Sequence, residues 1–476
     1  MNAEPVREVV FPRTAEGKRS SSELGRAVVA DALRAADPAA AEAAGREHDW
    51  RRGYLSHFRT LVEAGLPAGA GYDIASAGLA SVQERMRVHR GGEDITPADA
   101  LAEKVDRPLR TVTVHGGEKP EQELTLPYAG ELLRGDGLSR RLDAWVAAGT
   151  IEESCAEAVR EVAGNPDWLD LSDQRLVVLG AAAEMGPLPA VLGWGGTVVG
   201  VDLPRAGLWA RVINTAERSA GVLIAPARAG QTGADLLTDL PAVAEWILGI
   251  DGRLVLGNYV FAPGAAYARL SAAVDALTIH IRRQRAETAL AFLATPTDVF
   301  AVPPEAVAQA RERYRSRSTR ARIAGRLSGG RLLQPNYPGD TDPGIADSLV
   351  AQQGPNYALA KRIQRWRASV ARRDDITVSF AVAPPTNTRS VTNNRLLSAA
   401  YAGAHLFGVE VFEPATSNKL MAALLVHQLR KPRAAAAEAW RDEAVHAAHG
   451  GLWRVAYQPR SALGLAALRG LSGRRR

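Results

Sequence analysis

The chain has 476 residues, 46% of them hydrophobic, and a formal net charge of +6. This length and apolar content allow a large buried core and predict two to three folding units. The single cysteine, Cys155, excludes an internal disulfide and a cysteine-based metal cluster. We expect no metal site and a reducing compartment, by default the cytoplasm. No segment approaches the roughly 20 apolar residues of a membrane span, and the first residues lack the apolar core of a secretory signal.

Two arginine clusters carry much of the positive charge, one from Arg311 to Arg326 and the other at residues 474–476. The favoured interpretation is a solvated helix face and a frayed terminus, so no nucleic-acid partner is expected. Binding to phosphate, nucleic acid or an anionic membrane is the alternative, which leaves peripheral membrane contact open.

The first third of the chain indicates a mainly helical N-terminal domain at residues 22–170, after a disordered or extended start at residues 1–21. Alternating apolar and polar residues predict a pair of strands at 111–114 and 123–126, separated by Gly116 and Gly117. No catalytic motif and no metal-ligand spacing of histidines is found here.

From Arg175 onward, apolar runs alternate with helical segments, which predicts a parallel sheet flanked by helices. We assign residues 171–430 to this domain and 431–476 to a helical C-terminal extension. An Arg-, Gly- and Pro-rich segment at 303–355 is interpreted as an insertion. Strands are predicted at residues 176–179, 197–201, 221–224, 254–256, 290–293 and 376–382.

The first of these strands runs into a turn of small residues that begins at Gly180 and ends at Gly186. Small residues let the backbone approach a pyrophosphate, and free N–H groups at the start of a helix favour its charge. The second strand ends at Asp202, 22 residues past Gly180, where an acidic residue contacts a ribose hydroxyl. This favours NAD, because a carboxylate repels a 2′-phosphate, although Arg205 leaves NADP open.

Tyr357 and Lys361 lie four residues apart in a helix predicted after Gly354 and Pro355, so both project from one face. A phenol with a reference pKa near 10 is a poor acid–base group at neutral pH. A neighbouring ammonium favours the phenolate and lowers that pKa. This spacing is therefore typical of an acid–base pair.

The order of Tyr357, Lys361, helix, strand and the loop led by Pro384 resembles the short-chain dehydrogenase/reductase family over about residues 176–429. The resemblance implies a Rossmann-like doubly wound α/β fold, with the helical N-terminal domain and the insertion as additions. It also implies that Tyr357 is the acid–base group and that Lys361 tunes it and holds the nicotinamide ribose. The cofactor contacts that it implies are Gly180, Ala182, Met185, Gly186, Asp202, Asp235, Leu236, Asn258, Lys361, and Thr386 or Thr388.

Three positions depart from the family pattern. The family's catalytic serine, about a dozen residues before the tyrosine, is missing, and Ser348 is only nine residues upstream. Thr295 or Thr297, at the end of the preceding strand, is the better substitute because a hydroxyl donates the same hydrogen bond. Glu184 stands where a glycine is usual, and Asp275 lies near the place of a structural asparagine.

We therefore expect an NAD(P)-dependent oxidoreductase that interconverts a carbonyl and a hydroxyl of a small-molecule substrate. A lipid or acyl-thioester substrate and a homo-oligomer are left open. The alternative, indicated by Glu184 and the missing serine, is a catalytically altered dinucleotide-binding sensor or scaffold protein.

Overall fold

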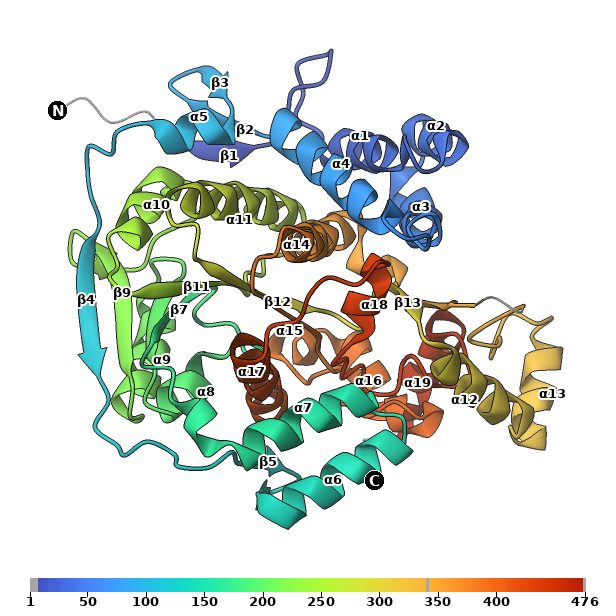
Figure 1. Cartoon of the computed structure of the whole chain (residues 1–476). Helices are drawn as coiled ribbons and strands as arrows, with labels where there is room; N and C mark the ends of the chain where they lie inside the picture. Colours follow the sequence, from blue (N-terminus) through green and yellow to red (C-terminus); the bar gives the residue numbers. More distant parts are fainter. Residues whose placement is uncertain (1–6, 340–341, 474–476) are drawn as a thin grey trace.

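A mainly parallel sheet lies at the centre of the computed structural model, which describes residues 7–339 and 342–473 (Figure 1). Six of its strands are parallel, in the order β9-β8-β7-β11-β12-β15. Counted along the chain this order is 3-2-1-4-5-6, which is compatible with a Rossmann-like fold. The bounds are β7 (Gln174–Leu179), β8 (Thr197–Val201), β9 (Val222–Arg228), β11 (Arg253–Asn258), β12 (Ala289–Ala294) and β15 (Val378–Val382).

All six predicted strands are confirmed, and the largest shift at a strand end is four residues, at the end of β9. These strands could be predicted from the sequence because both faces of the sheet are covered, which makes each strand a nearly continuous apolar run. Val177, Val178 and Leu179 in β7, for example, are all completely buried.

The predicted pairing of residues 111–114 with 123–126 is wrong. β4 (Arg110–His115) instead joins the central sheet and pairs antiparallel with β9 over its whole length, beside the short β10 (Gln231–Thr232). The edge of β9 offers six register partners, more than a short hairpin would supply. The strand predicted at 123–126 is also wrong, because only Leu126 of it lies in a strand, β5 (Leu126–Tyr128), which pairs with β6 (Glu131–Leu133).

The opposite edge of the sheet, at β15, is closed by two groups that are not in strands. The side chain of Gln428 accepts a hydrogen bond from Phe380 N (2.6 Å) and donates one to Phe380 O (3.0 Å). Ala448 N donates to Val382 O (2.9 Å). The C-terminal part of the chain therefore covers this edge.

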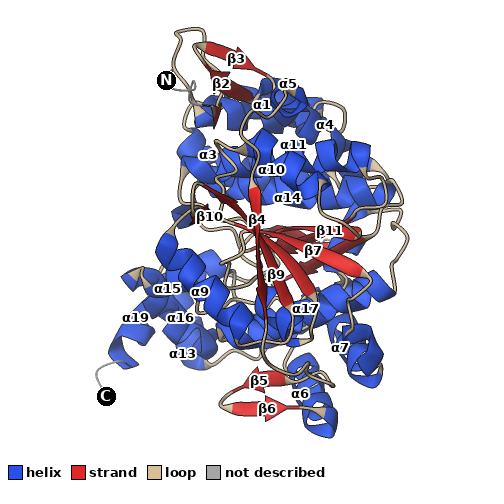
Figure 2. Cartoon of the chain, turned by 90° about the vertical axis from the view of Figure 1, so that its left-hand side faces the viewer, coloured by secondary structure: helices blue, strands red, loops and turns tan. Residues whose placement is uncertain are grey.

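Helices cover both faces of the sheet (Figures 1 and 2). One face carries α10 (Leu240–Leu248), α11 (Ala265–Gln284) and α14 (Pro355–Arg373). The other carries α7 (Glu153–Gly164), α8 (Leu188–Gly193), α9 (Ala206–Glu217) and α17 (Pro414–Arg430).

The N-terminal residues contribute to both sides of the molecule. Five helices and a small sheet lie over α11 and α14, and Gly78 of α4 leaves the room that the ring of Trp366 in α14 occupies. β4 then leads to the other side, where α6 (Gly135–Ala147) and α7 follow. The elements of the outer layer are β1 (Glu8–Val10), α1 (Ser21–Leu33), α2 (Pro38–Arg46), α3 (Trp50–Ala64), α4 (Ala70–Arg85), β2 (Arg87–Arg90), β3 (Glu93–Ile95) and α5 (Pro97–Ala102).

The segment at 303–355, between β12 and α14, is well structured where it is described. Its last strand, β14 (Gly344–Asp347), pairs antiparallel with β13 (Val299–Val302), and two helices lie between these strands along the chain. The remaining elements of this segment are α12 (Pro304–Arg315), α13 (Thr319–Leu327) and the 3-10 turn η2 (Ala351–Gln353).

The helical C-terminal extension predicted from residue 431 begins later, because residues 432–438 are irregular and the next helix starts at Ala439. Carbonyl groups of this stretch bind elsewhere: Ala436 O accepts from the Tyr72 hydroxyl (2.8 Å), and Ala437 O accepts from Gly69 N (3.0 Å). The predicted arginine tail at 474–476 and the first six residues lie outside the described ranges. The other elements after β15 are α15 (Arg389–Thr392), α16 (Arg395–Ala404), η3 (His405–Phe407), α18 (Ala439–Ala444) and α19 (Pro459–Gly473), and η1 (Pro166–Leu169) precedes β7.

Across residues 7–339 and 342–473, no helix combines the length and apolar character that crossing a bilayer requires.

Candidate functional site

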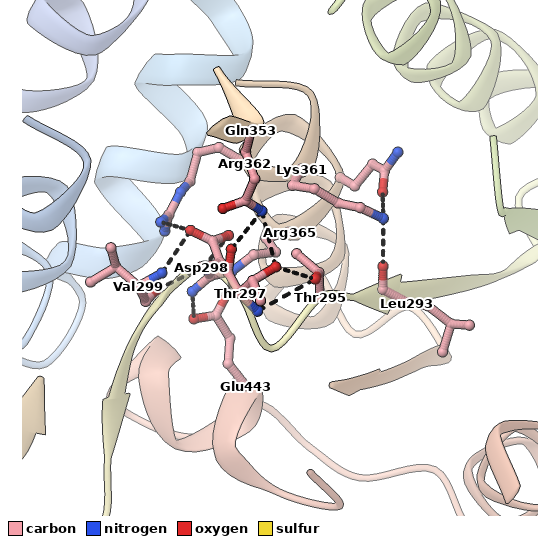
Figure 3. A network of polar contacts seen from close by, with 11 residues as sticks. Leu293, Thr295, Thr297, Asp298, Val299, Gln353, Lys361, Arg362, Arg365 and Glu443 are labelled. Carbon is pink, nitrogen blue, oxygen red and sulfur yellow. Dashed lines mark hydrogen bonds and ion pairs between the residues drawn. The ribbon is translucent and has the colours of Figure 1, made fainter. Parts of the chain in front are cut away.

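The predicted catalytic residues meet at the carboxyl edge of the sheet, where β12 ends and α14 begins (Figure 3). In open parallel α/β sheets, ligands bind in the crevice outside this edge. α14 starts at Pro355, directly after Gly354, whose φ of +79° favours glycine. Tyr357 and Lys361 lie in the first two turns of this helix, as predicted.

Lys361 is held by two acceptors. Its Nζ donates to Leu293 O in β12 (3.2 Å) and to Gln364 Oε1 (3.2 Å). The ammonium therefore joins the start of α14 to the end of β12.

Both candidate threonines also belong to this site. The side chain of Thr295, the residue after β12, lies close enough to that of Tyr357 to lower the pKa of the phenol. Thr295 Oγ1 lies 2.9 Å from Thr297 Oγ1, which accepts a hydrogen bond from Gln353 Nε2 (2.9 Å). The structure thus brings Tyr357, Lys361, Thr295 and Thr297 together, although the segment at 303–355 separates them along the chain.

The pKa of Tyr357 moves in the direction opposite to our expectation. Burial raises this pKa, and the Lys361 ammonium and the nearby Thr295 hydroxyl offset that rise only in part. Burial also lowers the pKa of Lys361. Desolvation disfavours both charged forms and here outweighs their attraction. The phenol is consequently protonated at neutral pH and can serve as a proton donor.

Three aromatic side chains that the sequence did not indicate lie near the Tyr357 phenol: Tyr267, Phe261 and Tyr401. The ring of Tyr267 in α11 lies 5.5 Å from that of Tyr357, and Lys361 Nζ lies 5.9 Å from the centre of the Tyr267 ring. Phe261 packs edge-on against Tyr267 at 5.4 Å. Burial raises the pKa of Tyr401 in α16 to about 12, with a contribution from Tyr357. None of these residues has a motif spacing that could have identified it.

A network of buried ion pairs holds the loop at residues 295–298, which follows β12 and carries both threonines (Figure 3). Arg365 of α14 donates to Asp298 Oδ2 (2.7 Å) and, with two nitrogens, to Glu443 (2.7 and 2.8 Å). Arg362 lies 3.3 Å from the other oxygen of Asp298. Burial alone would raise the pKa of Asp298, but the two guanidinium groups lower it. Asp298 stays ionised and fixes the loop to α14.

The turn at residues 180–186, predicted to bind phosphate, contacts Asp202, the acid predicted to bind the ribose. Gly180 has a φ of +91°, and a Cβ there would lie 2.8 Å from Tyr259 O, so only glycine fits. Asp202 Oδ2 accepts from Ala182 N (2.9 Å), and Oδ1 accepts from Leu203 N (2.8 Å). Burial raises the pKa of Asp202 against these two hydrogen bonds. The carboxylate therefore ties the turn to the end of β8.

The far end of the turn is occupied by side chains from other elements. Asn418 of α17 donates to Gly186 O, and Met185 is partly buried against the core. α8 begins at Leu188, directly after Pro187, and has six residues. Glu184 accepts from Arg389 N (2.7 Å) and lies 3.3 Å from Arg389 Nε. The unexpected acid is thus neutralised by the segment after β15.

The remaining predicted cofactor residues lie near this edge with varied partners. Asp235 Oδ1 accepts from Leu237 N (2.9 Å), and Leu236 is buried in the core. Asn258 ends β11 and is buried, and its Oδ1 has no hydrogen-bond partner among the described residues.

The two threonines after β15 differ in exposure. Thr386 is buried, and its Oγ1 lies 2.9 Å from Pro384 O and 2.6 Å from Ser417 Oγ. Thr388 pairs at the surface with Ser390 (2.9 Å). The hydroxyl of Thr388 is therefore the more accessible of the two.

Two further residues singled out in the sequence, Asp275 and Ser348, are buried. Asp275 binds Arg367 Nε (2.6 Å) and Gln83 Nε2 (2.6 Å), which join α11 to α14 and α4. Ser348 directly follows β14. It is buried, and its hydroxyl has no hydrogen-bond partner in the described part of the chain.

In the ranges that the structure describes, no group of three or more His, Cys, Asp or Glu side chains could hold a metal ion. No protein-family model matches the chain, and no curated protein matches it significantly.

Proposed function

We propose that the chain is an NAD(P)-dependent oxidoreductase of the short-chain dehydrogenase/reductase type, with a Rossmann-like domain that holds the dinucleotide. The observation that carries this proposal is the meeting of Tyr357, Thr295 and Lys361 at the carboxyl edge of the parallel sheet, where Lys361 Nζ binds Leu293 O. An acid, a hydroxyl donor and an ammonium in this arrangement suit proton transfer to a carbonyl oxygen.

In the proposed reduction, the Tyr357 hydroxyl gives its proton to the substrate oxygen. The hydroxyl of Thr295 or Thr297 donates a second hydrogen bond to that oxygen as its negative charge develops. Lys361 stabilises the resulting phenolate. The nicotinamide supplies or accepts the hydride when it is bound. In the reverse direction Tyr357 takes the proton back.

The residues present fit a dinucleotide. Gly180 lets the backbone approach a pyrophosphate, and each oxygen of Asp202 keeps a free lone pair for a ribose hydroxyl after accepting one N–H. The buried Asn258 Oδ1 is an acceptor without a partner in the described residues, at the end of the strand next to β7. Such orphaned acceptors are uncommon and suit a ligand donor. Asp202 favours NAD.

The Glu184–Arg389 contact favours a second candidate, a dinucleotide-binding sensor or scaffold without turnover. It joins the phosphate turn to the segment after β15 and places a carboxylate where a pyrophosphate would lie. A protein of this kind would bind the dinucleotide and change the position of this segment.

The test is turnover and binding in the Tyr357→Phe variant. Binding of NAD(H) and NADP(H) is followed by nicotinamide fluorescence, and turnover by loss of reduced cofactor with a panel of aldehydes and ketones. We expect the variant to bind like the wild type and to lose at least about 100-fold in turnover, since general acid catalysis contributes that much. Tyr314→Phe, on the remote α12, is the control.

Normal turnover by Tyr357→Phe would overturn the catalytic assignment. Binding without turnover in the wild type would favour the sensor. Absence of dinucleotide binding would overturn both.

A further inference from the structure

The outer face of α13 displays large aliphatic side chains to solvent. Ile323 is 51% exposed and Leu327 is 84% exposed, and they lie one turn apart. The side chains that face the protein are the small ones, Ala321 and Ala324. A helix that packs on its own domain has the reverse pattern, with its large apolar residues inward. Burial within this chain therefore does not account for Ile323 and Leu327.

Arginines flank this apolar pair on both sides. At 100° per residue, Arg320 lies on one side of Ile323 and Leu327, and Arg322 and Arg326 lie on the other. All three are exposed, and among the described residues none forms an ion pair with a carboxylate. The sequence from Arg313 to Gly339 contains no acidic residue. The face is thus both apolar and strongly basic.

α13 is anchored at both ends. Ser318 Oγ caps its start by accepting from Ala321 N (3.3 Å), and Arg322 donates to Arg315 O (3.1 Å). Beyond its end, Gln334 N donates to Ser461 Oγ (3.0 Å) at the start of α19. The face is therefore presented by a fixed scaffold.

More exposed aliphatic residues lie on the neighbouring helices at the same end of the molecule. Figures 1 and 2 both place α13, α16 and α19 there. Of the eight large hydrophobic residues that are exposed in the described ranges, six belong to this region. They are Ile323, Leu327, Leu396, Leu406, Leu468 and Leu471.

We propose that the outer face of α13 docks this protein on an anionic membrane surface. Aliphatic side chains flanked by arginines suit the boundary between headgroups and acyl chains. A single-stranded nucleic acid would need aromatic side chains for base stacking, and none of the six exposed residues is aromatic. Two copies of such a basic face would repel each other. This inference is independent of the proposed catalytic function.

Vesicle sedimentation with the full chain tests the proposal, using phosphatidylcholine vesicles with and without phosphatidylglycerol. We expect binding only to the anionic vesicles, and weaker binding at high salt. Arg320→Gln, Arg322→Gln and Arg326→Gln should each lower the partition coefficient about fivefold, since a basic residue near the surface contributes ~1 kcal/mol. Ile323→Ser with Leu327→Ser should lower it by on the order of tenfold.

Leu132→Ser is the matched control, because Leu132 is 61% exposed on β6, whose partner strand β5 lies far from α13 in Figure 1. This variant should bind vesicles like the wild type. Equal binding to both vesicle types, binding to neither, or an equal loss in Leu132→Ser would overturn the proposal. So would self-association, or oligonucleotide binding without vesicle binding, that disappears in the α13 variants.

Discussion

Glu184 places a negative charge on the turn where the proposed dinucleotide phosphate would lie, and Arg389 neutralises it. The Arg389 side chain is 63% exposed and that of Glu184 is 27% exposed, so the guanidinium is free to turn toward another anion. A pyrophosphate at this turn would compete with Glu184 for Arg389. In the proposed complex Arg389 would bind the cofactor, and Glu184 would be the group that holds Arg389 in place beforehand.

Replacing Glu184 and replacing Arg389 should therefore change the dinucleotide affinity in opposite directions. Glu184→Gln removes a competitor and a repulsive charge worth ~1 kcal/mol, so the Kd for NADH should fall about fivefold. Arg389→Gln should raise it by a similar factor. Titration of nicotinamide fluorescence measures both. Glu42→Gln, which removes the exposed Glu42–Arg46 pair on the distant α2, is the control and should leave the Kd unchanged. Weaker binding in Glu184→Gln would contradict this view of the turn.

The site shows how far sequence reasoning reaches at the scale of single residues. Tyr357 and Lys361 were identifiable from their spacing, and Thr295 and Thr297 from their place after a predicted strand. The Arg365–Glu443 pair was not, because its members are 78 residues apart and charged residues are common. The raised pKa of Tyr357 was also missed, since it depends on desolvation that the sequence does not report.

At the scale of elements, α16 and α19 cross at two glycines. A Cβ on Gly470 would collide with Ala399 O, and one on Gly403 would collide with Ala466 O. The two helices are antiparallel, since residues 399 and 403 face 470 and 466. Their backbones approach more closely than any larger residue would allow, and this contact holds α19 on the protein.

Replacing Gly470 or Gly464 of α19 by alanine should have opposite effects on stability. Gly470→Ala should separate α16 from α19 and destabilise that contact by about 1–3 kcal/mol. Gly464, in the same helix, faces open space, and Gly464→Ala should stabilise the helix by about 0.5–1 kcal/mol. Hydrogen exchange of the α19 amides would measure both. Similar protection in the two variants would show that the crossing does not depend on Gly470.

The elements also differ in how well the sequence predicted them. The six parallel strands were predictable because burial on both faces leaves apolar runs. The partner of β4 was not, because an alternating strand fits any free sheet edge and the hairpin interpretation used only the nearest candidate. The Ala-rich stretch after Arg433 has helical composition, yet its carbonyl groups bind Gly69 and Tyr72.

At the scale of the whole molecule, one buried carboxylate joins α7 to the C-terminal segment. Glu152, just before α7, accepts from His449 Nε2 (2.8 Å) and from Arg454 Nε and Nη2 (2.8 and 2.7 Å). Burial raises the pKa of Glu152, but the hydrogen bonds from Arg454 and His449 outweigh it and lower the pKa to about 2.

This lowered pKa makes the contribution of Glu152 dependent on pH. Because the folded-state pKa lies below the ordinary value of 4.5, the stabilisation is fully present above that value and is lost as the pH falls toward about 2. At neutral pH the stabilisation of the folded state by ionised Glu152 amounts to about 3 kcal/mol. Urea unfolding over this pH range should show Glu152→Gln less stable than the wild type at neutral pH, with the gap closing in acid. Glu153→Gln, at an exposed neighbour, is the control. A gap that does not depend on pH would contradict this view.

The side chain of Gln428 decides where the central sheet ends. A bare edge strand exposes N–H and C=O groups that can template pairing with another chain, and natural proteins block such edges. Here one amide occupies both backbone groups of Phe380, and Ala448 takes the next carbonyl. Gln428 and Ala448 thus keep β15 from pairing with a strand of another chain, a risk that returns whenever these two residues detach from the edge.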